Sequence, residues 1–63
     1  MRTNAERAER AYRALLAYGI EGDEEEAVTD LLTDLRHLSD QYDWTVDELA
    51  ERSVMHYEAE IQA

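Results

Sequence analysis

One periodic run of apolar residues limits the fold of this chain more than any other feature. Between residues 24 and 42 the apolar positions recur at intervals of three, four, three and four residues, at Val28, Leu31, Leu35, Leu38 and Tyr42. This is the spacing of one face of an amphipathic α-helix, and Leu32 widens that face. Asp23 and the acidic run Glu24–Glu26 precede it, as expected where a helix begins. We therefore predict a helix over residues 24–41 whose apolar face forms the centre of the core.

A second helix is predicted near the start of the chain. Thr3 and Glu6 have the spacing of a capping box, in which each side chain accepts a hydrogen bond from the other residue's backbone N–H. Gly19 can adopt the positive φ that often ends a helix. These signals predict a helix over residues 4–18. Most of its apolar face is alanine, so it can lie close to a neighbour while burying little.

A third helix is predicted over residues 46–61. Thr45 and Glu48 repeat the capping-box spacing. Trp44 and Leu49 occupy the positions of a hydrophobic staple, which fixes the direction in which the chain enters a helix. The link from the preceding helix is short, so the second and third helices are expected to pack roughly antiparallel.

The three helices predict an all-α fold, a small three-helix bundle in a single domain spanning residues 1–63. The chain has 63 residues, with no cysteine to form a disulfide and no proline to interrupt a helix. A chain of this length buries only about 60% of the surface it exposes when unfolded. We therefore expect marginal stability, with self-association as one means of reinforcement.

Charge is divided unevenly along the chain. Residues 1–18 hold four arginines and two glutamates, a net charge of +2, whereas residues 19–63 hold two arginines and fourteen acidic residues, a net charge of −12. Such acidity disfavours direct binding to nucleic acid or to an anionic membrane and favours a basic partner. The chain also contains no lysine. A second interpretation therefore stays open, in which the acidity reflects the base composition or salt adaptation of the source organism.

The hydropathy pattern predicts no membrane association. No apolar run approaches the roughly 18 residues that span a bilayer. The first ten residues are charged throughout and lack the apolar middle of a signal peptide. We therefore expect the protein in the cytoplasm of its host cell.

Two histidines raise the question of a metal site. Asp34 and His37 are three residues apart, and His56 and Glu60 are four apart, spacings compatible with ligands on one helix face. The helical pattern places His37 on the polar face, so the two pairs are not expected to converge on one ion. The sequence also lacks a glycine-rich phosphate loop and a cysteine nucleophile. We predict no metal, no cofactor and no catalytic residue, hence no enzyme; a metal-dependent enzyme or sensor remains an alternative.

The aromatic residues divide into two groups. Tyr12, Tyr42 and Tyr57 lie on the apolar stripes of the three helices and are predicted to be core residues. Tyr18 and Met55 fall outside these stripes. They are the better candidates for an exposed contact surface.

The exposed carboxylates suggest a binding mechanism. On a helical body a few nanometres long, they approach the charge density of a DNA duplex, which carries about one negative charge per 1.7 Å of axis. Rigid helices would present them to a groove that binds phosphates. An acidic surface that only keeps the protein soluble explains the same pattern. The predicted partner-binding residues are Glu24, Glu25, Glu26, Asp30, Asp34, Asp40, Asp47, Glu48 and Glu51.

Two segments resemble a known group of proteins. DLLTDLRHLSD (Asp30–Asp40) and HYEAE (His56–Glu60) resemble the pattern D-L-L-x-D-L-x-H … H-Y-x-x-E of small uncharacterised acidic proteins from bacterial phages, prophages and plasmids. The resemblance implies an origin in a mobile element and no particular activity. In size, acidity and helical content the chain is also similar to anti-CRISPR proteins, several of which mimic DNA on CRISPR surveillance complexes. The first resemblance covers about residues 27–60, and residues 1–22 lie outside it; the second is one of type and not of motif.

These observations lead to one functional prediction and one alternative. The prediction is a phage or mobile-element inhibitor of the anti-CRISPR type. As an acidic DNA mimic, it would bind the basic surface of a host nucleic-acid-binding complex, such as a CRISPR effector, and block DNA access. The alternative is a non-enzymatic helical protein–protein interaction or regulatory module. One form of that module is a homodimer using Tyr18, Met55 or the first helix.

Overall fold

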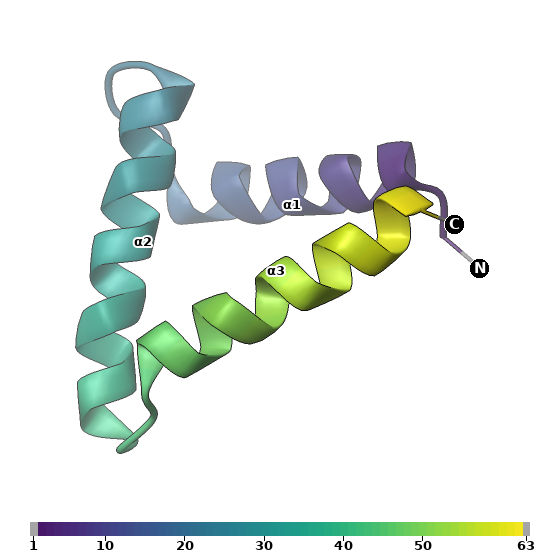
Figure 1. Ribbon diagram of the computed structural model, residues 1–63. Helices are drawn as coiled ribbons and strands as arrows, with labels where there is room; N and C mark the ends of the chain where they lie inside the picture. The colour runs from purple at the N-terminus through teal and green to yellow at the C-terminus, as the bar shows by residue number, and fades with distance from the viewer. Residues whose placement is uncertain (1, 63) are drawn as a thin grey trace.

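Three α-helices and the turns between them make up the described part of the chain (Figure 1). The computed structural model describes residues 2–62; Met1 and Ala63, the two ends of the predicted domain, lie outside the described residues. The prediction of an all-α three-helix bundle is confirmed, and the helix bounds agree with the predicted ones to within one residue. The helices are α1 (Asn4–Tyr18), α2 (Glu24–Gln41) and α3 (Val46–Gln62).

Helix α1 begins at the capping box that the sequence predicts. Thr3 Oγ1 accepts a hydrogen bond from the Glu6 N–H at 3.1 Å, and Glu6 Oε1 accepts one from the Thr3 N–H at 2.9 Å. At the other end, Gly19 has a φ of 107° and donates its N–H to the Leu15 carbonyl. Glycine suits this position because a Cβ disfavours positive φ.

Helices α2 and α3 begin differently. Asp23 Oδ1 accepts a hydrogen bond from the Glu26 N–H at 2.8 Å and so caps α2. At α3, the Thr45 carbonyl accepts the first helical bond from Leu49. The reciprocal side-chain bonds of a Thr45–Glu48 capping box, expected from the sequence, are not found among the hydrogen bonds of residues 2–62.

A tight turn joins α2 to α3. The Ser39 carbonyl accepts hydrogen bonds from both Tyr42 and Trp44 N–H groups, at 3.2 Å and 3.0 Å. Between them Asp43 adopts a left-handed conformation, with a φ of 58°. The Trp44 ring stacks on Tyr42 with a centroid separation of 4.8 Å, and it lines a hollow with Leu49 beside the start of α3.

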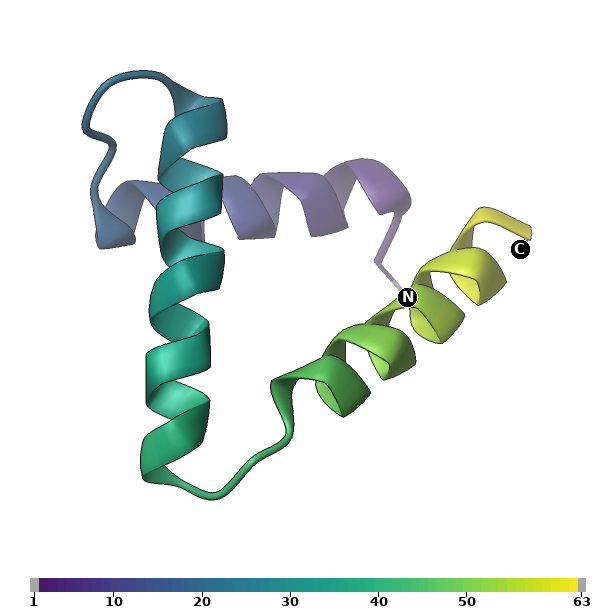
Figure 2. The ribbon, with the colours of Figure 1, turned by 60° about the vertical axis from the view of Figure 1, so that its left-hand side comes forward.

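The helices form the three sides of an open triangle (Figures 1 and 2). Helix α3 leaves the lower end of α2 at an oblique angle, so it returns toward the N-terminal end of α1 and does not lie along α2. The prediction that these two helices pack antiparallel is therefore wrong, because they splay apart from the turn that joins them. The Cα atoms extend over 34 × 28 × 17 Å, which describes a flattened body.

Polar contacts close the corner between α1 and α3. The Arg7 Nε atom lies 3.1 Å from Glu60 Oε2, and the Asn4 side-chain amide donates to the Glu60 carbonyl at 3.2 Å. Both contacts lie near the surface. Isolated pairs of this kind are worth roughly 0–1 kcal/mol, so this corner is held weakly.

Few side chains are buried. Leu15 and Ala27 are the buried apolar residues of the described chain, and Ser39 is the buried polar one. The radius of gyration is 13.2 Å, whereas a compact chain of this length has about 11 Å. The expectation that α2 forms the centre of a core is therefore wrong for most of its stripe, because α1 and α3 lead away from opposite ends of α2 and neither lies along its apolar face.

Candidate interaction surface

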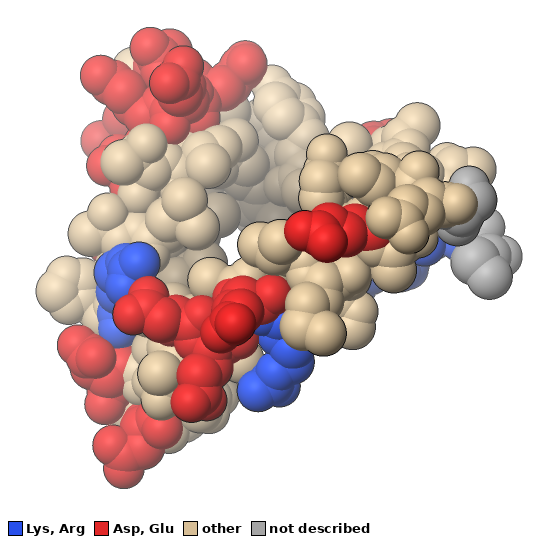
Figure 3. All heavy atoms as spheres, in the orientation of Figure 1, with Lys and Arg blue, Asp and Glu red and all other residues tan. Residues whose placement is uncertain are grey.

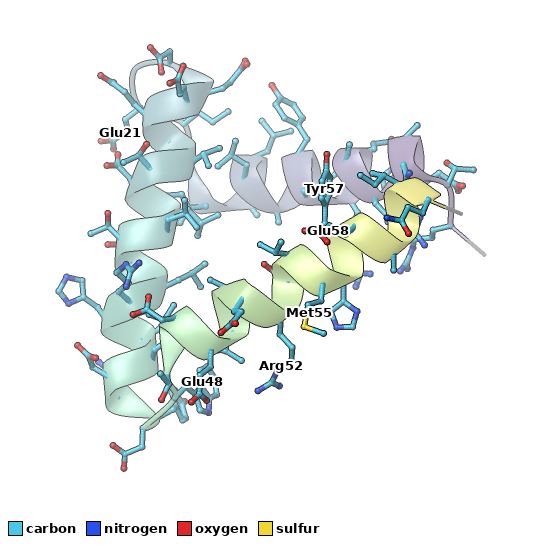
Figure 4. The ribbon with its side chains drawn as sticks, viewed as in Figure 1. Glu21, Glu48, Arg52, Met55, Tyr57 and Glu58 are labelled. Atoms are coloured by element: carbon cyan, nitrogen blue, oxygen red, sulfur yellow. The ribbon has the colours of Figure 1, made fainter. Side chains whose placement is uncertain are left out.

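Acidic residues gather at the start of α2. Asp23 caps the helix and Glu24–Glu26 occupy its first turn, where the helix dipole stabilises negative charge. A hollow at this end is lined by Asp23, Glu25, Glu26 and Asp30 together with Thr29. Figure 3 shows acidic side chains covering this end of the molecule, and Figure 4 labels Glu21 in the same region.

A second acidic group lies where α2 ends and α3 begins. It contains Asp40, Asp47, Glu48 and Glu51. Here positive charge is interspersed, since Arg36 Nη1 lies 3.2 Å from Asp47 Oδ1 and links the two helices. Helix α2 is about 27 Å long at 1.5 Å per residue, and this length separates the two acidic groups.

All nine carboxylates predicted to bind a partner are exposed. Three of them are engaged within the chain: Glu24 accepts from the Tyr12 hydroxyl, Asp34 from the Tyr18 hydroxyl, and Asp47 pairs with Arg36. Among residues 2–62, the other six have no hydrogen bond or ion pair to their side chains. These six are Glu25, Glu26, Asp30, Asp40, Glu48 and Glu51.

The bond between Tyr18 and Asp34 joins α1 to α2 and perturbs the tyrosine. Donation of the phenolic hydroxyl to the Asp34 carboxylate is the main cause that raises the pKa of Tyr18 to about 12. Partial burial and the nearby charges of Asp34, Asp30 and Glu21 act in the same direction. Ionised Tyr18 would lose the bond and face three carboxylates, so the neutral phenol is favoured.

Large apolar side chains are exposed along all three helices. Tyr12, Tyr42 and Tyr57 are 44%, 60% and 61% exposed, so the prediction that they are core residues is wrong. Tyr18 and Met55 are exposed, as predicted. Periodicity identifies which residues share a helix face, but it does not show whether another helix covers that face.

Six of these residues define what we call the open apolar face. They lie on the apolar stripes of α2 and α3, and each is between 40% and 61% exposed. In Figure 3 uncharged surface lines the hollowed region between these helices; acidic side chains cover the start of α2 and the start of α3, and a further acidic group lies on α3 where Figure 4 labels Glu58. Figure 4 shows Tyr57 on the upper side of α3 and Arg52 and Met55 on its lower side. The open apolar face consists of Val28, Leu35, Leu38, Val54, Tyr57 and Ile61.

A basic hollow lies on α1. It is lined by Arg2, Arg7 and Arg10, by two alanines, and by Glu60 from α3. Arg7 pairs with Glu60, whereas Arg2 and Arg10 have no ion pair within residues 2–62. The positive charge of this segment is evident from the sequence, whereas its concentration around one hollow is a property of the fold.

The histidines do not share a site. His37 and His56 are both exposed, on α2 and α3 respectively. Among residues 2–62, no three His, Cys, Asp or Glu side chains are placed to hold a metal ion together.

Comparison with known proteins gives no relative: the chain matches no protein-family model, no curated protein and no solved structure. Within residues 2–62, none of the helices combines the length and the hydropathy needed to cross a bilayer.

Proposed function

We propose that the protein is a non-enzymatic helical interaction module, which binds another protein chain through the open apolar face. The observation that carries this proposal is the exposure of most of the apolar stripe on α2 and on α3; Leu31 and Val46 are the half-buried members. Single exposed apolar residues are ordinary, but a contiguous exposed patch rimmed by polar residues is typical of a protein-binding site. A partner that covers the face would supply the core that the chain lacks.

A matched pair of substitutions tests this proposal. Tyr57→Asp and Met55→Asp each add one negative charge to an exposed position of α3, but only Tyr57 belongs to the open apolar face. We expect immobilised wild-type protein and the Met55→Asp variant to retain the same partner from host lysate, and the Tyr57→Asp variant to lose it. Equal retention by all three proteins would contradict the proposal.

Nucleic-acid mimicry is a second candidate function. Its support is that six of the nine predicted carboxylates have no partner within residues 2–62, and that three of them lie near one another at the start of α2. In this proposal the protein is a phage or mobile-element inhibitor in the host cytoplasm. Its acidic groups occupy the basic groove of a nucleic-acid-binding complex, such as a CRISPR effector, and block DNA.

Charge reversal separates the two candidates. Under mimicry, changing Glu25, Glu26 and Asp30 to lysine slows association with the basic complex, and added salt does the same, because steering by charge is screened. Under the apolar proposal, Tyr57→Asp weakens binding more than the triple lysine variant does. Association rates measured by surface plasmon resonance at low and high salt distinguish these outcomes.

A further inference from the structure

The accessible surface of the chain is too large for a compact monomer. It measures 5630 Å², whereas a folded monomer of 7.3 kDa exposes about 4,200 Å² by the usual scaling with mass. Each chain therefore exposes about 1,400 Å² more than a compact protein of its size. This excess agrees with the large radius of gyration and with the small number of buried side chains.

The excess area has the size of a homodimer interface. If each of two copies lost an area of this size on association, about 2,800 Å² would be buried in total, within the range of about 2,000–5,000 Å² of obligate homodimers. The side chains available for burial include Leu35, Val54 and Tyr57, which are 40%, 51% and 61% exposed. Interfaces of obligate homodimers are characteristically apolar, with a composition similar to that of a domain core.

The charges of one chain are also complementary to those of a second copy. The basic hollow on α1 holds Arg2 and Arg10, and the acidic hollow at the start of α2 holds Glu25 and Glu26. None of these four side chains has an ion pair within residues 2–62. In a two-fold symmetric dimer, a contact between two different patches occurs twice. The basic patch of the first copy meets the acidic patch of the second, and the acidic patch of the first meets the basic patch of the second.

We propose that the open apolar face is the interface of a homodimer, and that its occupant is a second copy of this chain. The inference rests on the proposed function and names the partner. The apolar faces of the two copies meet at the centre. The basic hollow of each copy faces the acidic hollow of the other.

The first test is the mass of the purified full chain in solution. Sedimentation equilibrium over a range of concentrations should give a dimer for the wild type. Tyr57→Asp should raise the dissociation constant at least about tenfold, because a carboxylate would be buried in an apolar contact. Met55→Asp, which adds the same charge outside the open apolar face, should leave the constant nearly unchanged. Far-UV circular dichroism checks that both variants keep their helices.

The second test uses charge reversal within one chain. Changing Arg2 and Arg10 to glutamate should weaken the dimer. Adding Glu25→Arg and Glu26→Arg to the same chain should restore it, because both symmetric contacts then have opposite charges again. As a control, Glu25→Arg and Glu26→Arg alone should also weaken the dimer. Additive losses in the combined variant would overturn the proposed pairing of the hollows.

The outcomes separate this inference from the proposed function. A wild-type chain that stays monomeric at all concentrations overturns the homodimer. In that case, Tyr57-dependent capture of a different protein still supports the interaction module. A dimer that is lost with Met55→Asp and kept with Tyr57→Asp overturns the open apolar face as the interface. A dimer with the expected response to Tyr57→Asp supports both proposals.

Discussion

Tyr18 and Asp34 give the clearest pH dependence at the scale of single residues. The folded chain raises the pKa of Tyr18 from 10.0 to about 12, mainly through the hydrogen bond to the Asp34 carboxylate. Because the folded-state pKa is above the unfolded value, the stabilising contribution is fully present below pH 10 and is lost as the pH rises to 12. Urea denaturation across this range should therefore show a steeper loss of stability for the wild type than for Tyr18→Phe. Parallel losses in the two proteins would show that the bond does not form in solution.

Thr3 and Glu6 support a second prediction at this scale. The backbone N–H of Thr3, followed by its hydroxyl, lowers the pKa of Glu6 below the ordinary value of 4.5. Because the folded-state pKa is depressed, the contribution of Glu6 is present above the unfolded value and is lost as the pH falls through the folded one. Thr3→Ala should cost about 1 kcal/mol of stability, whereas Thr3→Ser keeps the capping hydroxyl and should cost much less. Denaturation followed by circular dichroism at neutral pH compares the two variants; equal losses would exclude a capping role for the hydroxyl.

Ser39 sets the geometry at the scale of the helices. It is only 4% exposed, its carbonyl accepts two hydrogen bonds from the turn, and its hydroxyl donates to the Leu35 carbonyl of its own helix at 2.9 Å. Ser39→Leu should destabilise the chain by about 1–3 kcal/mol, because a larger side chain does not fit the corner between α2 and α3. Ser39→Ala should be nearly neutral, since it removes only a bond within α2.

The same experiment tests the packing at that corner. Denaturation midpoints give the stability of both variants. If Ser39→Leu is as stable as Ser39→Ala, the corner between α2 and α3 is open in solution and the burial of Ser39 does not fix the direction of α3.

Net charge dominates at the scale of the whole molecule. The chain has sixteen acidic residues and six arginines, which give a net charge of −10. The three ion pairs among the described residues lie near the surface. Salt should therefore raise the stability, because screening of repulsion among carboxylates outweighs the loss of weak pairs. The Debye length falls from about 30 Å at 0.01 M to about 3 Å at 1 M. This range includes both the distances between carboxylates of one acidic group and the length of α2 that separates the two groups.

Urea denaturation at fixed protein concentration over this range of salt measures the effect. Glu25→Gln with Glu26→Gln is the control, since it removes repulsion at the start of α2 and should show a smaller response to salt. A fall in stability with added salt would mean that attractive pairs control the fold.

Local signals were sufficient to predict the helices. The capping residues Thr3 and Asp23, the glycine after α1 and the three-and-four spacing of α2 act within one or two turns, so neighbouring residues alone decide them. The exposure of Tyr18 and Met55 followed in the same way from their positions outside the stripes. The nine carboxylates were correctly expected to be exposed, because none of them lies on an apolar stripe.

The sequence by itself thus determined three helices, the composition of each face and the uneven distribution of charge. The tertiary structure alone decided the angle at which α3 leaves α2, and with it the exposure of residues such as Leu35 and Tyr57. The physical reason is that an amphipathic stripe requires a cover but does not specify which surface provides it. Either another helix of the same chain or a second chain can cover an apolar stripe. Which of the two covers it depends on contacts between residues far apart in the sequence.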